Sequence, residues 1–165
     1  MELVIVRHAS AFARDPRRWP DDRERPLTPE GMLRARRTAA GLGRILAPPE
    51  RVLTSPFVRA VETAAILTTH AGWAQASPCT ALAPEVPPEA LLEALRAEPA
   101  RRIAIVGHEP QLGRLMAHCL ASAARAQAFA LKKFGVAFLS FDGTPTAGQA
   151  TLRGLLSPGV LRAIR

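Results

Sequence analysis

The order of apolar and polar residues predicts alternating strands and helices over most of the chain. Residues 3–6 and 103–106 are continuous apolar runs rich in β-branched side chains, which is typical of strands buried on both faces. Residues 51–54 predict a short strand, and residues 136–141 predict another that pairs with 150–156 as a hairpin. A strand over 77–82 is the weakest of these predictions, because the segment contains a proline and a cysteine.

Apolar residues spaced three and four apart predict helices over 29–46, 57–67 and 109–120, a shorter one over 89–97, and a C-terminal helix after residue 157. Thr28 is a good N-cap, and the Pro29-Glu30 pair that follows it suits the first turn of a helix. Ser55 followed by Pro56 repeats this signal. The alternation over the first 120 residues predicts a three-layer α/β/α sandwich with a mainly parallel sheet.

Length and composition indicate an ordinary folded domain. The chain has 165 residues, of which 48% are hydrophobic and 22% charged, so we expect a single domain over 1–165. It has no apolar stretch long enough for a membrane span and no signal segment, so we expect a cytoplasmic protein with no membrane partner. Cys79 and Cys119 have neither metal-ligand nor redox spacing, which favours packed thiols.

The formal net charge of +8 favours anionic partners in general. The arginines between Arg14 and Arg25 alternate with acidic residues, which is typical of a solvated loop, and no aromatic residues interleave with a basic patch. We therefore expect no specific nucleic-acid binding. Trp19, in the middle of this loop, could border a site or cover the core.

Polar residues follow three predicted strands: Arg7-His8 after the first, Ser55 with Arg59 one turn later, and His108 after another. The carboxyl ends of parallel strands meet at one edge of a sheet, where open α/β folds place their sites. Two of these strand ends lead directly into helices, whose N-termini favour anions. Two arginines and two histidines at one point predict a phosphoryl-binding site, because a phosphoryl group accepts several charge-assisted hydrogen bonds.

The sequence argues against other ways of binding phosphate. No group of residues has metal-ligand spacing, and neither G-x-x-x-x-G-K nor G-x-G-x-x-G occurs. We therefore expect a site with no metal and no cofactor. His70 and His118 are expected to be surface residues.

Four motifs occur in order along the chain: Arg7-His8-Ala9, Arg25-Pro26-Leu27-Thr28-x-x-Gly31, Ser55-Pro56-x-x-Arg59-Ala60-x-x-Thr63-Ala64 and Val106-Gly107-His108-Glu109-Pro110. Together they resemble the histidine phosphatase superfamily, whose fold is phosphoglycerate mutase-like. Asp22-x-x-Arg25 and Ser157-Pro158 resemble most the SixA-type phosphohistidine phosphatases within it. The resemblance spans nearly the whole chain.

The resemblance implies that His8 is the nucleophile and forms a covalent phosphohistidine. It implies that Arg7, Arg59 and His108 bind the phosphoryl group, and Ser55 is a further candidate for phosphate binding. The superfamily usually has glycine after the first Arg-His pair, where this chain has Ala9. The SixA-like branch often has alanine there.

The general acid is open at this stage. Family members that act on alkyl phosphates carry a carboxylate after the second helix, and Glu85 matches that position best, with Glu109 as the other option. A phosphohistidine substrate needs a general acid less, because its imidazole leaves more readily than an alkoxide. The expected substrate is a protein phosphohistidine and the expected state a monomer. The alternatives are a phosphatase for a small phosphorylated metabolite and an inactive module that binds phosphorylated ligands.

Overall fold

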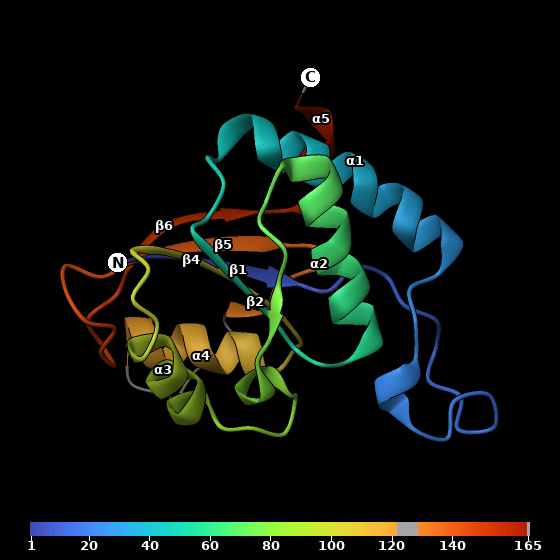
Figure 1. The fold of residues 1–165 in the computed structure, drawn as a ribbon, viewed down its shortest axis with the longest axis horizontal. Coiled ribbons are helices and arrows are strands. Elements are labelled where there is room, and N and C mark those ends of the chain that lie inside the picture. Colours follow the sequence, from blue (N-terminus) through green and yellow to red (C-terminus); the bar gives the residue numbers. More distant parts are fainter. Residues whose placement is uncertain (122–128, 165) are drawn as a thin grey trace.

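The computed structural model describes residues 1–121 and 129–164 (Figure 1). Its strands are β1 (Glu2–Arg7), β2 (Arg51–Thr54), β3 (Ser77–Pro78), β4 (Arg102–Gly107), β5 (Val136–Ser140) and β6 (Thr151–Leu156). Its α-helices are α1 (Pro29–Ile45), α2 (Val58–Ala71), α3 (Pro88–Arg96), α4 (Gln111–Leu120) and α5 (Pro158–Ala163). Two 3-10 turns, η1 (Asp22–Glu24) and η2 (Thr80–Leu82), complete the described elements. None of the described helices is long and apolar enough to cross a membrane.

The strands form one sheet in the order β3-β2-β4-β1-β5-β6. The first four are parallel to one another, whereas β5 is antiparallel to both β1 and β6. The predicted α/β class and the C-terminal hairpin are therefore confirmed. The two predicted apolar runs, β1 and β4, lie side by side in the middle of this sheet.

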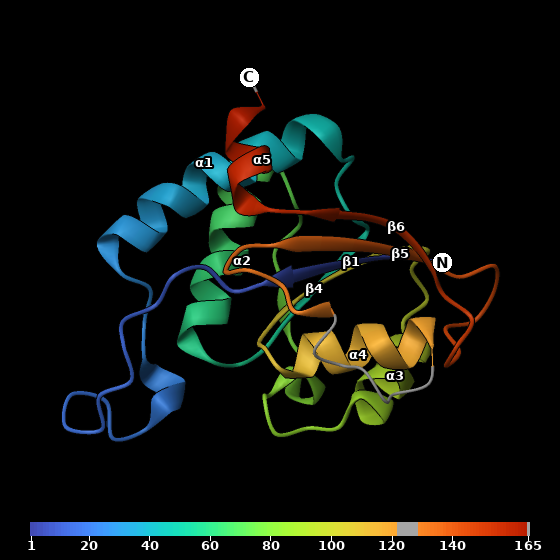
Figure 2. The same ribbon diagram turned by 180° about the vertical axis from the view of Figure 1, so that it is seen from behind.

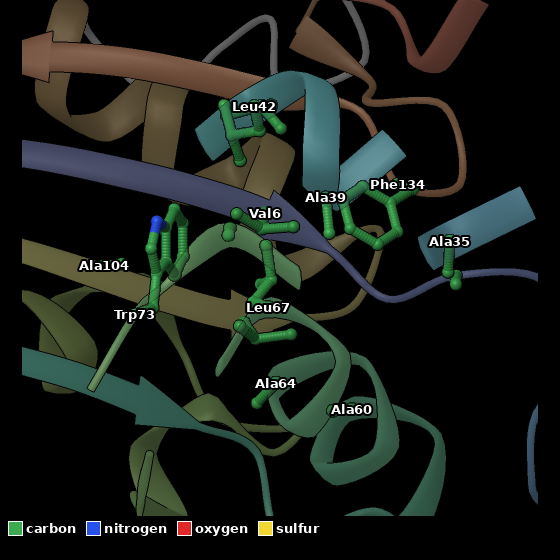
Figure 3. Packing of buried hydrophobic residues seen from close by; sticks show 14 of the residues in the cluster. Val6, Ala35, Ala39, Leu42, Ala60, Ala64, Leu67, Trp73, Ala104 and Phe134 are labelled. Atoms are coloured by element: carbon green, nitrogen blue, oxygen red, sulfur yellow. The ribbon is translucent and has the colours of Figure 1, made fainter. Parts of the chain in front are cut away.

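Helices cover both faces of the sheet, with α1, α2 and α5 on one face and α3 and α4 on the other (Figures 1 and 2). Side chains alternate along β1 and pack into a core on each face of the sheet. Val4 and Val6 pack against the core under α1 and α2, and Leu3 and Ile5 pack against the core under α3 and α4. In Figure 3, Val6 lies among residues of the first core, which include Ala39, Leu42, Leu67, Trp73 and Phe134. The strand is therefore buried on both faces, as its apolar run predicts.

The predicted start of α1 is confirmed in its details. The Thr28 side chain accepts the backbone N–H of Gly31 at 2.9 Å, and Pro29 takes the first helical position. The helix packs on the core through a stripe that includes Ala35, Ala39 and Leu42.

Two local predictions are wrong. Ser55 does not cap α2, which begins at Val58 with Phe57 in the cap position and no side-chain cap. The strand predicted over 77–82 ends after two residues, because Pro78 has no N–H to donate and the chain turns into η2. That turn buries Leu82 completely.

The segment between β1 and α1 leaves the sheet and closes on itself just before α1. The N–H of Thr28 donates to the Ser10 carbonyl at 3.0 Å, and Ala11 pairs with Leu27 in an isolated antiparallel bridge. Residues 12–26 extend beyond this point as a loop, seen in blue in Figure 1. Gly31 lies directly under the closure, where a Cβ atom would be 2.1 Å from the Ser10 carbonyl oxygen.

We expect Gly31→Ala to destabilise the protein by about 1–3 kcal/mol, because the added methyl group would push apart the base of the loop and α1. The clash must exceed the gain of roughly 1 kcal/mol that alanine brings to a helix. Urea denaturation measures this change in the free energy of unfolding. Gly143→Ala is the control, since a Cβ atom there would meet nothing within 4 Å. Equal stability of the two variants would contradict the prediction.

Candidate active site

The carboxyl ends of β1 and β4 bring two histidines together. Arg7 pairs with Gly107 in the parallel register, and the N–H of His8 donates to the Gly107 carbonyl at 2.9 Å. The rings of His8 and His108 consequently lie with their centroids 5.0 Å apart. They face a cavity of about 390 Å³, which is lined by Arg7, His8, Ala11, Arg14, Asp22, Arg25, Phe57, Arg59, Pro84, Glu85, His108, Glu109 and Lys133.

The His8 ring is held in one tautomer. Its Nδ1 lies 2.7 Å from the Ala9 carbonyl oxygen, and because a carbonyl only accepts, Nδ1 carries the proton. The lone pair is therefore on Nε2. Burial lowers the pKa of His8 to about 3; the bond to Ala9 opposes this shift, and the nearby charges of Arg59 and Arg7 reinforce it. The imidazole is neutral near pH 7, so its Nε2 can act as a nucleophile or a base.

His108 is more deeply buried than His8, with 2% of its surface exposed. Its Nε2 lies 2.8 Å from the Ser55 hydroxyl oxygen, and its Nδ1 has no partner within the described residues. Burial lowers the pKa of His108 to about 2, and the neighbouring His8 and Arg59 lower it further. When the Ser55 hydroxyl donates to Nε2, the proton of the neutral ring is on Nδ1, which can then donate to a ligand.

Ser55 is completely buried and does not line the cavity. Its hydroxyl contacts the His108 ring and also accepts the N–H of Phe57 at 3.4 Å. Phosphate binding by Ser55 stays a prediction; in this structure the Ser55 hydroxyl is placed to position the His108 ring.

Arg59 reaches the cavity from the first turn of α2. Its two terminal nitrogens bond to Asp22, Nη1 to the carbonyl oxygen at 2.8 Å and Nη2 to the carboxylate at 3.1 Å. The guanidinium also lies 4.9 Å from the centre of the Phe57 ring. Burial lowers the pKa of Arg59, as does the charge of Arg25, while Asp22 opposes the shift. The position of this cation is thus fixed by the 12–26 loop as well as by α2.

Arg7 is held by a second chain of contacts. Its Nη1 donates to the Leu131 carbonyl at 2.6 Å, and the N–H of Leu131 donates to the Glu109 carboxylate at 2.7 Å. The other Glu109 oxygen accepts the N–H of Gly113 at 3.2 Å. Burial lowers the pKa of Arg7, and the charge of Glu109 opposes this. Glu109 therefore joins the start of α4 to the segment that clamps Arg7.

The segment over 131–135 wraps the Arg7-His8 pair. The N–H of Phe134 points at both the Arg7 and His8 carbonyls, at 3.1 and 3.2 Å, and the Gly135 carbonyl accepts the N–H of Arg7 at 3.1 Å. Phe134 adopts a positive φ of 58°, which is strained for a bulky residue, while its side chain is buried in the core. The energy of burying the ring holds this backbone against the strand end.

Within the part of the chain that the structure describes, three buried nitrogens at the site have no partner: Arg7 Nε, Arg59 Nε and His108 Nδ1, the last of which is a donor when the Ser55 hydroxyl donates to Nε2. Across the described residues, only Trp73 and Gln111 contribute other buried side-chain atoms of this kind. Buried polar groups are usually satisfied, so three unpaired donors around one cavity indicate a ligand with several acceptor atoms. The charged lining residues are five cations (Arg7, Arg14, Arg25, Arg59 and Lys133) and three carboxylates (Asp22, Glu85 and Glu109). The ligand that suits this site is an anion such as a phosphoryl group.

The two candidate carboxylates differ in their surroundings. Both oxygens of Glu109 accept backbone N–H groups, so this side chain is part of the scaffold. Glu85 lines the cavity, is exposed, and makes no hydrogen bond to the described part of the protein. Glu85 is thus the one that can meet a leaving group without breaking an existing contact.

Three residues of the site, Asp22, Arg25 and Thr63, belong to the motifs that carry the family resemblance, but the sequence interpretation gave them no individual role. Asp22 and Arg25 lie in the loop interpreted as solvated, yet Arg25 bonds to Asp22 at 2.7 Å and both line the cavity. Asp22 and Arg25 are three residues apart, which places both on one turn, and this spacing is the signal in the sequence that they could interact. Thr63 accepts the N–H of Ala9 at 3.0 Å and donates to the Arg59 carbonyl at 2.7 Å, so it joins the His8 segment to α2.

The other residues considered lie away from the cavity. His70 is exposed, as predicted, whereas His118 is only partly exposed and lies 3.6 Å from Glu89. Trp19 neither lines the cavity nor enters the core; it stacks on Phe12 within its own loop. Among the residues described, no three His, Cys, Asp or Glu side chains gather where they could hold a metal ion.

Comparison with known proteins gives consistent similarities. A model of the histidine phosphatase superfamily (branch 1) matches residues 3–83. An uncharacterized protein of Picosynechococcus sp. is 34% identical over 139 residues, which cover 82% of each chain. The solved structure of the protein histidine phosphatase SixA complexed with tungstate is 26% identical and has a TM-score of 0.81, with 98% of this chain and 99% of that chain covered.

A further solved structure, the alpha-ribazole phosphatase of Shigella flexneri, has the same fold at 17% identity. Its TM-score is 0.74, with 96% of this chain and 97% of that chain covered. The region that matches the family model contains the Arg7-His8 pair and Arg59, two parts of the cavity just described. The chain belongs to the histidine phosphatase superfamily.

Proposed function

We propose that this protein is a phosphatase that acts through a covalent phosphohistidine on His8, and that its substrate is a protein phosphohistidine. The observation that carries the proposal is the state of the His8 ring. Its Nδ1–H is bound to the Ala9 carbonyl, so the Nε2 lone pair is available, next to three buried donors that lack protein partners. A neutral nucleophile beside positive charge suits attack on an anionic phosphoryl group.

In the first step, the Nε2 lone pair of His8 forms a bond to phosphorus as the bond to the leaving group breaks. The phosphorylated ring carries a positive charge, which the hydrogen bond from Nδ1–H to the Ala9 carbonyl stabilises. Arg7, Arg59 and His108 hold the phosphoryl oxygens, and this electrostatic role is where most of the rate enhancement originates.

In the second step, a water molecule attacks the phosphohistidine. A bond from water oxygen to phosphorus forms, the phosphorus–Nε2 bond breaks, and the electron pair returns to His8 as its lone pair. The protons of the water remain with the released inorganic phosphate and solvent. The neutral His8 ring is thereby restored in the tautomer that the Ala9 carbonyl selects.

The leaving group favours phosphohistidine as the substrate. A general acid must lie within hydrogen-bond reach of the leaving group. Glu109 is engaged by two backbone N–H groups, and no hydrogen bond within the described residues holds Glu85 in one position, so neither carboxyl group is fixed where a leaving group would depart. The imidazole of a phosphohistidine needs such help least. The similarity to a protein histidine phosphatase supports the same substrate class.

One observation favours the alternative, a phosphatase for small phosphorylated molecules. Glu85 lines the cavity next to Pro84 and makes no bond to the described protein, so a bound alkyl phosphate could receive a proton from it. This alternative uses the same phosphoryl site and differs only in the leaving group.

We expect His8→Ala to lower hydrolysis of an aryl phosphate to the background rate, because the substitution removes the Nε2 lone pair, and the other lining histidine, His108, has its Nε2 engaged by Ser55. Incubation of the wild type with ³²P-labelled phosphohistidine protein, followed by rapid quenching at alkaline pH, should trap acid-labile phosphate on His8. His70→Ala is the matched control, since His70 is an exposed histidine far from the cavity. A binding module without activity would show neither turnover nor trapped phosphate.

The buried neutral histidines should make stability depend on pH. The pKa is about 3 for His8 and about 2 for His108 in the folded protein, against roughly 6.5 when unfolded. Below pH 6.5 the unfolded chain therefore holds more protons, and the free energy of unfolding falls as pH falls, by up to about 1.4 kcal/mol per pH unit for each histidine. Urea denaturation at pH 7, 6 and 5 measures this slope. His8→Gln should reduce it, and an unchanged slope would contradict the prediction.

Glu85→Gln should separate the two substrate classes. We expect hydrolysis of an alkyl phosphate to fall by about 10²-fold in kcat if Glu85 is its acid, and hydrolysis of phosphohistidine to change less than about threefold. Steady-state kinetics on both substrates measure this. Glu109→Gln is the comparison: it should weaken turnover of both, because it releases the segment that holds Arg7. An equally large loss on phosphohistidine in Glu85→Gln would refute the proposed substrate.

A further inference from the structure

Two cations that line the cavity have no role in the reaction proposed above. Arg14 comes from the 12–26 loop and Lys133 from the segment over 131–135, and both line the cavity. Both side chains are exposed. Within residues 1–121 and 129–164, neither side chain donates a hydrogen bond or pairs with a carboxylate.

The remaining lining cations are already engaged. Arg7 is held by a backbone carbonyl and Arg59 by Asp22, and both line the same cavity as the two histidines. Arg25 bonds to Asp22 and also donates to the Phe12 carbonyl at 2.6 Å. The positive charge needed by one phosphoryl group is therefore supplied in the buried part of the cavity, without Arg14 or Lys133.

The cavity also has room for more than a phosphoryl group. Its volume of about 390 Å³ lies within the roughly 300–1,000 Å³ typical of sites for whole small ligands. Glu85 and Pro84 line the same cavity. The space beyond the phosphoryl site is therefore bordered by a carboxylate as well as by the cations of Arg14 and Lys133. Arg14, whose charge also acts on Asp22, and Lys133 are exposed and make no hydrogen bond within the described residues, so they give this space an attraction for a second anion.

We propose that Arg14 and Lys133 form a specificity subsite for a second anionic group, a carboxylate or phosphate, on the molecule that carries the phosphoryl group. The proposal rests on the proposed function for the identity of the phosphoryl site. The two side chains bind substrate and take no part in bond making. The second anion belongs either to a small phosphorylated acid or to an acidic side chain beside a phosphohistidine.

Non-hydrolysable phosphonates test the subsite without requiring turnover. Isothermal titration calorimetry compares Kd for 3-phosphonopropionate and 4-phosphonobutyrate with Kd for butylphosphonate, which lacks the carboxylate. In the wild type, the better carboxylate ligand should bind more tightly than butylphosphonate. Arg14→Gln and Lys133→Gln should each reduce that preference by about two- to fivefold, the range for an exposed charge contact, and the double variant should abolish it.

Matched controls come from the same two segments. Arg17→Gln and Lys132→Gln remove exposed cations that do not line the cavity, so they should leave the preference unchanged. Loss of the preference in these controls would mean that net charge alone attracts the ligand, and the subsite would be refuted. The subsite would also be refuted if the wild type bound neither phosphonocarboxylate more tightly than butylphosphonate. The same holds if Arg14→Gln and Lys133→Gln raised Kd for butylphosphonate as much as for the phosphonocarboxylates.

The source of the second anion requires a separate comparison. Phosphohistidine peptides with glutamate on either side of the phosphorylated residue are compared with glutamine versions, in the wild type and the double variant. A preference for glutamate that the double variant loses places the anion on a protein; a preference confined to the phosphonocarboxylates places it on a small molecule. Phosphonate binding with no hydrolysis of any phosphate would overturn the proposed function but support the subsite.

Discussion

The parallel pairing of β1 with β4 is the constraint on which the site depends. The register that sets Arg7 opposite Gly107 brings His8 and His108 out of the sheet side by side, and the hydrogen bond from the His8 N–H to the Gly107 carbonyl extends the ladder by one residue. A slip of one residue would exchange Val4 and Val6 with Leu3 and Ile5 between the two cores, and the different shapes of these side chains would not fit the packing there. The distance between the two histidines is thus set by the same burial that stabilises the sheet.

Burying the positive charges of the site costs desolvation energy, which contacts from the surrounding loops offset. Burial disfavours the charged forms of Arg7 and Arg59, and each is retained by contacts from distant parts of the chain: Glu109 acts through Leu131 on the first, and Asp22 acts on the second. The carboxylates compensate the cations only in part, and within the described residues the Nε atoms of both arginines have no hydrogen-bond partner. An anion that enters the cavity accepts hydrogen bonds from these groups. Because folding has already ordered the loops, no further reorganisation energy is needed for binding or reaction.

The sequence predicts the parts of this arrangement that depend on local patterns. Apolar runs locate β1 and β4, the Thr28 cap locates α1, and the residues that follow the strands identify Arg7, His8 and His108. It does not predict contacts between side chains that the fold alone brings together. Ser55 has the pattern of a helix cap yet bonds to a residue 53 positions away, and Glu109 bonds to a backbone N–H 22 positions away. Such contacts depend on three-dimensional proximity, which neither periodicity nor spacing encodes.

Burial divides the cavity into two parts with different physical requirements. His8, Arg59 and His108 are buried at the sheet edge, where the core fixes their positions and lowers the pKa of each. The groups beyond them, Arg14, Glu85 and Lys133, are exposed and come from loops. A change in the loops costs little core packing, whereas a change at the sheet edge disturbs the register and both cores. In the proposed reaction, attack at phosphorus would depend on the buried part of the cavity, and the choice of leaving group on the exposed loops, which can vary without unfolding the protein.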